Sequence, residues 1–442
     1  MKNDDNVHVV MLPWAAFGHL IPFFNLAIAL ARIGGIHVSF ISTPKNIKRL
    51  TKVPPNLTHL VKLVEFPMPV LGDETLLPQN AEASVDVTAE KIQYLKAAYD
   101  LLQQPVEHFI ADEKHDWIIA DFAQHWIVDI AENYEIPIIY YSIFTAAATG
   151  FSIAATLLGE APEILTSPVF QMLDFPSTLA YRKYEALELM SMCYVEDASS
   201  TSFAQRGSEI LSACIGLLLS PSPSTNLFSS DTSVQSIFKW LDQQKSGSIL
   251  FVGFGSECKP SKEQVDEIAH GLELSGLQFI WKLQKPNWGI FDEMDPLPEG
   301  FRQRTAEKGV VHIGWAPQKE ILAHPSIGGS LVQGGWGSVT ESLQYGHAVV
   351  VLAFVYDQGF NGRFLMEKGL GIEVERNEEG GSFTRNEIEK ALTYAMVSKE
   401  GEELRVRTKE AAAIFGDQKL HDSYVASFVE YLKSNREEIS TD

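Results

Sequence analysis

The sequence predicts an α/β protein built from two doubly wound domains, each with a parallel β-sheet. Three observations support this fold class. The chain has 442 residues, which is longer than a domain with a single hydrophobic core usually is. Short apolar runs alternate with longer amphipathic runs early in the chain, as strands and helices do around a parallel sheet. The same alternation restarts after a Ser- and Pro-rich stretch at residues 220–225, which is typical of a linker.

In the first half of the chain, short apolar runs predict three buried strands, at residues 7–12, 37–41 and 117–120. A turn at residues 13–19 separates the first strand from a helix at 21–33, which Gly34 and Gly35 end. Residues 91–110 are predicted as one helix.

The uncharged segment at residues 137–159 is long enough to cross a bilayer. Pro137, Gly150 and the many Ser and Thr residues of this segment instead favour a buried strand at 138–141 and a helix of small residues after it. We therefore expect no transmembrane segment. The first residues of the chain carry acidic side chains and no long apolar region, so they do not resemble a signal peptide.

In the second half, apolar runs predict further strands, at residues 249–254, 279–281, 310–311, 328–332 and 349–354. Two helix starts carry a capping box, formed by Ser261 with Gln264 and by Thr384 with Glu387. The first of these helices has one apolar face, made of Val265, Ile268, Ala269 and Leu272. An amphipathic helix is expected near the end of the chain, at residues 424–433.

The composition limits the classes of partner. The formal charge is −22, and Lys and Arg do not cluster, which argues against nucleic acid or an anionic membrane surface. The three cysteines form neither a disulfide framework nor a zinc motif and suit a reducing compartment; they are Cys193, Cys214 and Cys258. We expect a cytoplasmic monomer.

The segment at residues 315–358 contains the parts of a nucleotide-sugar site. It reads WAPQKEILAHPSIGGSLVQGGWGSVTESLQYGHAVVVLAFVYDQ. The strand at 328–332 leads into a glycine-rich turn, and a helix at 338–345 follows. The start of that helix offers unpaired N–H groups and a positive dipole end to a diphosphate. Trp315 offers a flat face to a uracil, and Glu341 is placed to accept hydrogen bonds from ribose hydroxyls.

This 44-residue segment resembles the signature box of the plant family 1 UDP-sugar-dependent glycosyltransferases. The resemblance implies the GT-B fold, in which two Rossmann-like domains face each other across a cleft. The first domain would bind the acceptor and the second the UDP-sugar. The boundaries that we expect are 1–219 for the acceptor domain, 220–235 for the linker, 236–423 for the UDP-sugar domain, and 424–442 for a C-terminal helix and tail that returns to the first domain.

The resemblance also implies roles for individual residues. Asp357 and Gln358 would hydrogen-bond the sugar hydroxyls, and Trp336 would bracket the sugar. The full set expected to bind the UDP-sugar is Ser256, Trp315, Ala316, Gln318, Gln333, Trp336, Gly337, Ser338, Glu341, Tyr356, Asp357 and Gln358. We expect the acceptor pocket to contain Trp14, Phe17, Phe122, Trp126 and Phe144. No cofactor and no metal ion is expected, because the sequence offers no convincing DxD metal site.

Two titratable residues are predicted to lie at the carboxyl edge of the first sheet. His19 follows the first strand, and Asp121 ends the strand at 117–120. At such an edge Asp121 can accept a hydrogen bond from Nδ1 of His19 and raise the basicity of Nε2. Nε2 would then take the proton of an acceptor hydroxyl. The pair matches the catalytic His and Asp positions of the family, which implies an inverting single displacement.

The sequence departs from the family in three places. Gln333 stands where the family has His, and Gly337 replaces a frequent Asn. The residues after 211–214 run straight into the Ser/Pro stretch, so the last strand–helix unit of the first domain is shortened or missing. The segments at 12–19 and 253–257 resemble a clade that adds a second sugar to flavonoid or terpenoid glycosides, with UDP-rhamnose as one donor.

The leading hypothesis is an inverting UDP-glycosyltransferase (EC 2.4.1.-). It would move a hexose, glucose or rhamnose, from a UDP-sugar to a hydroxyl of a small plant metabolite or its glycoside, of flavonoid or terpenoid type. The alternative is a catalytically weakened or inactive relative that binds UDP-sugar or metabolite without efficient turnover. A nicotinamide-dependent oxidoreductase is disfavoured, because no G-x-G-x-x-G motif follows the first strand.

Overall fold

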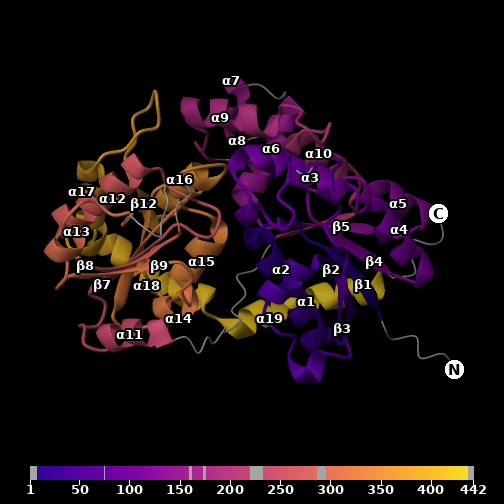
Figure 1. Cartoon of the computed structure of the whole chain (residues 1–442), viewed down its shortest axis with the longest axis horizontal. Coiled ribbons are helices and arrows are strands. Elements are labelled where there is room, and N and C mark those ends of the chain that lie inside the picture. Colours follow the sequence, from indigo (N-terminus) through magenta and orange to yellow (C-terminus); the bar gives the residue numbers. More distant parts are fainter. Residues whose placement is uncertain are drawn as a thin grey trace. The chain divides into compact units, whose positions relative to one another are not determined.

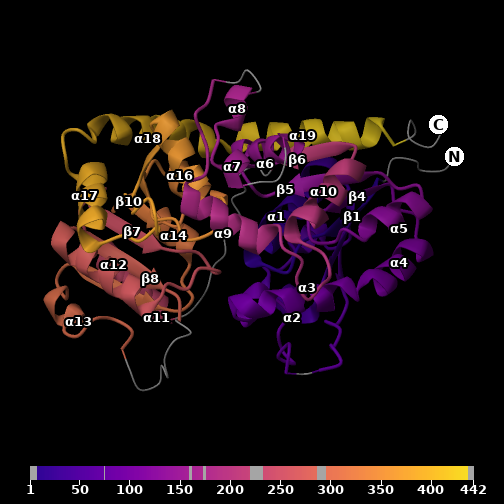
Figure 2. The same ribbon diagram turned by 90° about the horizontal axis from the view of Figure 1, so that it is seen from above.

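The computed structural model describes residues 7–73, 75–158, 162–172, 176–219, 232–285 and 295–436 (Figures 1 and 2). Contacts divide the chain into two compact units. Unit 1 comprises Met1–Ile143, Met190–Thr225 and Gln418–Asp442, and unit 2 comprises Phe144–Leu189 and Asn226–Asp417. Of the predicted linker at 220–235, residues 220–231 lie outside the described residues, and residues 232–235 form the start of a helix at Thr232–Leu241 instead of a linker.

Over its described residues, unit 1 contains one sheet of six parallel strands in the order β3-β2-β1-β4-β5-β6. This is the strand order of doubly wound nucleotide-binding domains, in which the order reverses at a switch point between the first and fourth strands. The strands are β1 (His8–Leu12), β2 (His37–Ser42), β3 (Val61–Glu65), β4 (Trp117–Ala120), β5 (Ile138–Ser142) and β6 (Gly216–Leu219).

Helices cover both faces of this sheet, because alternate strand residues point to opposite faces. Val9 and Met11 face a core that α1 shares with α19, which run side by side (Figures 1 and 2). Val10 and Leu12 face the core under α3, α4, α5 and α10. The helices are α1 (Phe17–Gly34), α2 (Pro44–Arg49), α3 (Ile92–Asp100), α4 (Gln103–Asp112), α5 (Ile127–Asn133), α10 (Phe203–Ala213) and α19 (Gln418–Ser434), with short 3-10 turns at Pro55–Leu57, Ser84–Asp86 and Ala89–Lys91.

Unit 2 repeats this topology. Its described residues form a sheet of six parallel strands in the order β12-β11-β10-β7-β8-β9, which places the switch point between β7 and β10. The strands are β7 (Ile249–Gly253), β8 (Gln278–Leu283), β9 (Gly309–Ile313), β10 (Ile327–Val332), β11 (Ala348–Val351) and β12 (Gly371–Glu373).

Helices also cover both faces of the second sheet. The core under α12 and α17 contains Leu250 and Val252, while Ile249 and Phe251 face the core under α11 and α14. The helices are α6 (Ala146–Leu158), α7 (Pro162–Leu165), α8 (Val169–Met172), α9 (Lys183–Cys193), α11 (Thr232–Leu241), α12 (Lys262–Ser275), α13 (Phe301–Arg304), α14 (Gln318–Leu322), α15 (Trp336–Gln344), α16 (Gln358–Lys368), α17 (Arg385–Met396) and α18 (Glu402–Phe415).

The segment Phe144–Leu189 belongs to unit 2, although the sequence placed it in the first domain. The cause is a set of side-chain contacts between residues that lie far apart in the sequence. Arg182 pairs with Glu373, and Arg363 pairs with Glu185. Such pairings leave no trace in local sequence pattern, so the predicted boundary at 219 does not coincide with this grouping.

Several elements agree with the predictions made from local sequence patterns. Both predicted capping boxes are present, at Ser261 with Gln264 and at Thr384 with Glu387. The described residues of the uncharged segment at 137–159 form the buried strand β5 and the helix α6, as predicted. Of the described helices, α1 is long and apolar enough for a membrane span by composition, and half of its apolar window is buried inside the protein.

Four predicted helices differ from their expected bounds. The last one, α19, begins at Gln418, before the start predicted at residue 424. α1 begins at Phe17 instead of residue 21, so Pro22 lies inside it. The predicted helix at 91–110 is two helices, α3 and α4, separated at Leu101 and Leu102. α15 begins at Trp336, two residues before the predicted start at 338. Gly18 and Pro22 near the start of α1, and Gly337 near the start of α15, are residues typical of turns, so the starts predicted for these two helices are too late.

Candidate active site

His19 and Asp121 meet at the switch point of the first sheet. Leu12 and Ala120, which end β1 and β4, lie opposite each other in the ladder, so the two following segments leave the sheet together. His19 lies in the first turn of α1, and Asp121 directly follows β4. Nδ1 of His19 lies 2.7 Å from Oδ2 of Asp121. The exposed fractions are 9% for His19 and 1% for Asp121, so the pair is shielded from water.

The other contacts of Asp121 define the direction of this hydrogen bond. Oδ2 also accepts the backbone N–H of Trp14 at 2.9 Å, and Oδ1 accepts that of Phe122 at 2.8 Å. A carboxylate that accepts from two N–H groups acts as an acceptor toward the imidazole as well. Nδ1 of His19 therefore carries the proton, and Nε2 carries the lone pair that a general base needs.

Buried side chains hold the loop beneath the pair. The hydroxyl of Tyr99 and the amide of Gln124 both donate to the carbonyl of Pro13, at 2.7 and 3.0 Å. Burial raises the pKa of Tyr99, so this hydroxyl stays a neutral donor. Sequence pattern did not indicate either residue, because both act through a backbone atom that lies distant in the chain.

Three of the five aromatic residues proposed for the acceptor, Trp14, Phe122 and Trp126, belong to one core cluster of unit 1. Phe122 lies against His19, with ring centroids 5.6 Å apart, and Trp14 packs edge-on against Phe122 at 6.1 Å. Phe17 is partly exposed and lies under the guanidinium of Arg49. Phe144 belongs to unit 2. Of the five, Trp14 and Phe122 are thus the ones placed beside the catalytic pair within unit 1.

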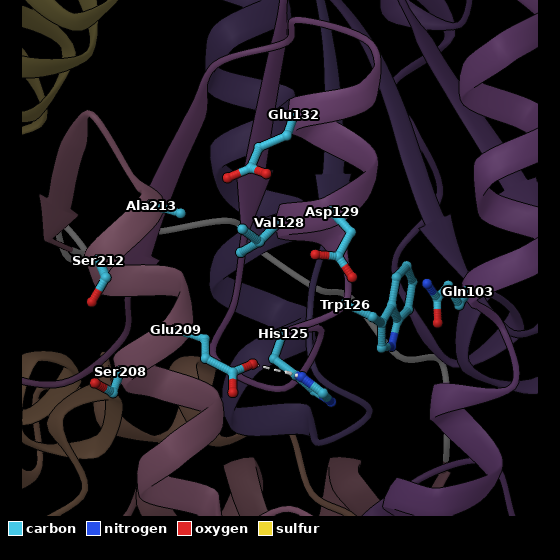
Figure 3. Close-up of a pocket in the computed structure, with 10 residues that line it drawn as sticks. All are labelled: Gln103, His125, Trp126, Val128, Asp129, Glu132, Ser208, Glu209, Ser212 and Ala213. Atoms are coloured by element: carbon cyan, nitrogen blue, oxygen red, sulfur yellow. Dashed lines mark hydrogen bonds and ion pairs between the residues drawn. The ribbon is translucent and has the colours of Figure 1, made fainter.

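Trp126 lines a separate hollow of about 540 Å³, shown in Figure 3. The neighbouring His125 also lines it, and its Nδ1 lies 2.8 Å from Oε2 of Glu209 on α10. Neither His19 nor Asp121 contributes to this lining. The hollow is therefore distinct from the site of the His19–Asp121 pair.

In unit 2, the glycine turn lies at the switch point of the second sheet. Val332 of β10 and Gly253 of β7 lie opposite each other at the ends of their strands. At Gly334 φ is +93°, and a Cβ there would lie 2.7 Å from the carbonyl oxygen of Gln358, so only glycine fits. Gly335 caps α15 without a side-chain hydrogen bond. The first N–H groups of α15, at Trp336, Gly337 and Ser338, are thus placed to bind an anion.

Gln333 packs against the loop that follows β7. A Cβ on Gly255, whose φ is +69°, would lie 2.4 Å from Nε2 of Gln333. Among the described residues, Oε1 of Gln333 is buried without a hydrogen-bond partner. Ser256 follows Gly255, and its hydroxyl lies 3.4 Å from Oε1 of Glu257. The turn therefore places Gln333 beside the segment that carries Ser256.

The residues expected to bind uridine lie around α14 and α15. Trp315 is 56% exposed, and Nε2 of His312 lies 2.6 Å from its carbonyl oxygen. The amide of Gln318 donates to Oε2 of Glu341 at 2.8 Å. Burial raises the pKa of Glu341, while the charge of Lys319 opposes this change. Ala316 is buried in the core below.

Two lysines near Glu341 were not predicted as part of the site. Nζ of Lys282 lies 3.4 Å from Oε1 of Gln318, and burial lowers the pKa of both Lys282 and Lys319. The charges of both lysines oppose the effect of burial on Glu341. Lys282 follows an apolar run in β8, where the pattern alone predicts a strand residue and nothing more.

At the start of α16, backbone groups orient the two residues expected to bind the sugar. Oε1 of Gln358 accepts the N–H groups of Phe354 and Val355, at 2.9 and 3.1 Å. Its Oε1 is therefore held by the backbone, and its Nε2 is the donor end of the same amide. Asp357 caps α16, and the preceding Tyr356 adopts a φ of +56°, an uncommon conformation for a non-glycine residue.

Asn361 connects Asp357 to the glycine turn after β10. Its Nδ2 donates to Oδ2 of Asp357 at 2.8 Å and to the carbonyl of Gly334 at 3.0 Å. Asn361 lies one helical turn after Asp357, a spacing that brings side chains together and that could have identified it from the sequence. Trp336 lies partly buried with its ring edge-on to Phe415, and a Cβ on Gly337 would meet open space.

Two doubly wound units, each with polar side chains at its switch point, define a nucleotide-binding α/β protein. Residues 229–406 match the family described as "UDP-glucoronosyl and UDP-glucosyl transferase". The chain is 38% identical to UDP-glycosyltransferase 91A1 of Arabidopsis thaliana, over 97% of both proteins. It is 36% identical to soyasaponin III rhamnosyltransferase of Glycine max, over 98% of this chain and 97% of that protein.

The chain belongs to the plant family 1 UDP-dependent glycosyltransferases. Among solved structures, a transferase of Glycyrrhiza uralensis complexed with glycyrrhetinic acid 3-O-monoglucuronide matches with a TM-score of 0.78 at 23% identity, over 97% of this chain and 96% of that chain. This likeness and the two parallel sheets identify the GT-B fold that the sequence predicted.

In the described part of the chain, no group of three or more His, Cys, Asp or Glu side chains is arranged to hold a metal ion. Independence from metal ions stays a prediction. The chemistry that a metal would supply to a leaving diphosphate is charge stabilisation, and the N-terminus of α15 is a candidate for that role.

Proposed function

We propose that the protein transfers a hexose, glucose or rhamnose, from a UDP-sugar to a hydroxyl of a small plant metabolite or its glycoside, of flavonoid or terpenoid type. The observation that carries the proposal is the buried His19–Asp121 pair, with Nδ1 and Oδ2 2.7 Å apart at the switch point of unit 1. Membership of the glycosyltransferase family supports the reaction class.

In the proposed reaction, Nε2 of His19 takes the proton of the acceptor hydroxyl. The hydroxyl oxygen attacks the anomeric carbon, the bond from that carbon to the phosphate oxygen breaks, and UDP leaves with the electron pair. Asp121 keeps the imidazole in the required tautomer and stabilises the imidazolium that forms. General-base catalysis of this kind accelerates a reaction roughly 10²- to 10⁴-fold. Attack on the face opposite to UDP inverts the anomeric configuration.

The proposal assigns the sugar donor to unit 2. Uracil would stack on Trp315 and the ribose would bind Glu341, while the first turn of α15 with Ser338 would receive the diphosphate, helped by Ser256. Donors aimed at the leaving group stabilise the charge that develops in the transition state. Nε2 of Gln358 would donate to one sugar hydroxyl, and the carboxylate of Asp357 would accept from another.

The names of relatives guide the choice of acceptor. One relative is named soyasaponin III rhamnosyltransferase, and a more distant one, 29% identical, is named mogroside IIIx synthase. Both names refer to glycosides, which favours an acceptor that already carries sugar and either UDP-rhamnose or UDP-glucose as donor.

We further propose that the enzyme is a cytoplasmic monomer, which cell fractionation and light scattering would test.

The second candidate function is a weakened or inactive relative that binds UDP-sugar or metabolite without efficient turnover. The buried, unpartnered Oε1 of Gln333 favours it. So does the alignment with the Arabidopsis relative, which extends over 469 positions although this chain has 442 residues. That relative therefore has residues that this chain lacks. The strand of the unit that was expected to be shortened or missing is present, as β6 (Gly216–Leu219) paired with β5, so the proposal of a shortened junction concerns the residues after 219.

An assay of UDP release separates the two candidates. UDP-glucose and UDP-rhamnose would each be incubated with a panel of flavonoid and terpenoid aglycones and their glycosides, and the products analysed by mass spectrometry. Acceptor-dependent UDP release with a product heavier by one hexosyl or deoxyhexosyl group supports the transferase. UDP binding without release on any acceptor supports the inactive relative.

A further inference from the structure

Four charged side chains of unit 2 connect the segment before the linker to α16 and β12. Arg182 binds Glu373 through two hydrogen bonds, of 2.8 and 2.7 Å. Arg363 binds Glu185 through two more, of 3.0 and 2.6 Å. The pairs are linked, because Nη1 of Arg363 lies 3.6 Å from Oε1 of Glu373. We refer to Arg182, Glu185, Arg363 and Glu373 as the clamp.

The carboxylates of the clamp are buried. The side chain of Glu373 is 2% exposed and that of Glu185 is 9% exposed. A buried carboxylate stays ionised only when donors meet its oxygens. Glu185 also accepts the backbone N–H of Arg182 at 2.8 Å. Removal of the Glu185 charge would leave Arg363 with the carbonyl of Ala180 and the 3.6 Å contact to Glu373 as partners, so each pair helps to fix the position of both of its members.

The clamp contacts α16 at its first turn. Gly359 is the second residue of this helix, and a Cβ there would lie 2.0 Å from Oε1 of Glu185. The absence of a side chain at this position therefore allows the carboxylate to approach the helix. One turn later, Nε of Arg363 donates to the carbonyl of Ala180 at 3.2 Å.

Other residues of Phe144–Leu189 hold the same part of α16. The ring of Phe360 packs against Phe151 and Tyr181, with centroids 5.1 and 5.2 Å away. The hydroxyl of Thr145 donates to Oδ1 of Asn361 at 3.0 Å. Positions 359, 360, 361 and 363 of α16 are thus all held by a segment that precedes the second sheet in the sequence.

α16 presents the sugar-binding candidates at its start, whereas the candidates for uridine and phosphate lie on other elements. Asp357 caps α16, and Gln358 is its first residue. A shift of α16 would therefore move these two residues relative to Ser338 and Glu341, which lie on α15. The hydrogen bonds from Asn361 to Asp357 and to the carbonyl of Gly334 also join the first turn of α16 to the glycine turn.

We propose that the clamp positions Asp357 and Gln358 for the sugar of the donor, which makes Glu185 and Arg363 positioning residues for sugar recognition and not for UDP binding. This inference rests on the proposed function, because it concerns the sugar half of the same site. It assigns a role in donor recognition to a segment of the first half of the sequence.

Glu185→Gln tests this inference, because it keeps the size of the side chain and removes its charge. The matched control is Glu267→Gln, which removes the charge from another ion pair of unit 2. In that pair Glu267 of α12 accepts from the guanidinium and the backbone N–H of Arg385 on α17. Calorimetry would give Kd for UDP, and initial rates with the preferred UDP-sugar would give kcat and KM for the donor.

We expect Glu185→Gln to lower kcat/KM for the UDP-sugar about tenfold or more, since a misplacement of about 1 Å can cost up to about 10²-fold. The Kd for UDP should stay within about twofold of the wild-type value, and Glu267→Gln should change neither quantity. Unchanged donor kinetics in Glu185→Gln, or an equal loss of UDP affinity and sugar transfer, would overturn the inference.

Gly359→Ala provides a second variant that keeps every charge. Its methyl group would displace the Glu185 carboxylate from α16, so we expect the same difference between UDP binding and sugar transfer. Full transfer activity in a folded Gly359→Ala variant would contradict the proposed role.

Amide hydrogen exchange measures whether the clamp holds α16 in place, and it requires no enzymatic activity. Amides of Gln358–Lys368 should exchange faster in Glu185→Gln than in the wild type, and unchanged exchange there would refute the clamp. If the wild type transfers no sugar from any donor, the proposed function fails, and the exchange result still decides whether the clamp holds α16. The two failures are thereby distinguished.

Discussion

Replacement of Gln333 by histidine tests how the glycine turn receives a diphosphate. In the free protein, Oε1 of Gln333 is buried without a partner among the described residues, and its Nε2 lies against Gly255. An unsatisfied buried acceptor costs roughly 1–3 kcal/mol. The amide atom nearest to the start of α15 is the donor Nε2, which would lie 3.4 Å from a Cβ on the N-cap residue Gly335.

Histidine supplies a ring N–H without this oxygen. A neutral hydrogen bond contributes roughly 0.5–1.5 kcal/mol and one that involves a charged donor about 1.5–3 kcal/mol. The difference is about 1 kcal/mol, which corresponds to roughly a fivefold lower Kd for UDP and a comparable gain in turnover. Calorimetric titration with UDP and initial-rate kinetics would measure both, at pH 6 and pH 8. The gain should be larger at pH 6, where the imidazole is more often charged.

Gln333→Leu is the matched control, because it removes the unpartnered oxygen without adding a donor. We expect it to raise the free energy of unfolding but to weaken UDP binding, which separates relief of the buried oxygen from the effect of a donor. If Gln333→His binds UDP no better than the wild type at either pH, Gln333 is already matched to its surroundings, and the reasoning about the donor is wrong.

Three further predictions follow from the site and the core. Asp121→Asn should lower kcat by at least about tenfold and at most about 10⁴-fold with UDP affinity unchanged; an undiminished rate would remove Asp121 from the mechanism. Transfer activity should survive EDTA, and a loss that Mg²⁺ or Mn²⁺ restores would show that an ion acts where we place the start of α15. Burial lowers the pKa of His115 and of His347 to about 4, from ordinary values near 6.5. As the pH falls from 6.5 towards 4, the unfolded chain gains protons that the folded protein does not, so the free energy of unfolding falls. Urea unfolding should show this slope, and His347→Asn should make it shallower; an equal slope in the variant would exclude His347 as a source.

The parts of the fold that the sequence predicted are those with a local signal. Both capping boxes and the strands β1, β4 and β7 follow from side-chain type and spacing over a few residues. β3 and α2 were missed. Val61–Glu65 places Lys62 and Glu65 in a short strand at the edge of its sheet, and charged residues there obscure the apolar pattern. Local signals therefore favour buried strands over edge strands.

The site could be predicted only where one segment contains it or where two strands share an edge. The turn at 333–335 and the start of α15 are contiguous, and the edge shared by β1 and β4 brings His19 to Asp121. The clamp could not be found in this way. Glu185 and Arg363 are 178 residues apart, and their pairing depends on how Phe144–Leu189 packs on α16. Tertiary contact of this kind leaves no periodicity in the sequence.

Product formation by the wild type and by His19→Ala is the most direct test of base-catalysed sugar transfer. Mass spectrometry would detect the glycoside formed from a UDP-sugar and an acceptor, and calorimetry on the same samples would measure UDP binding. We predict that the wild type forms the product, and that His19→Ala retains less than about a tenth of its rate with nearly unchanged Kd for UDP. A variant that keeps more than this fraction, or a wild type that binds UDP but forms no product with any acceptor, would contradict the account.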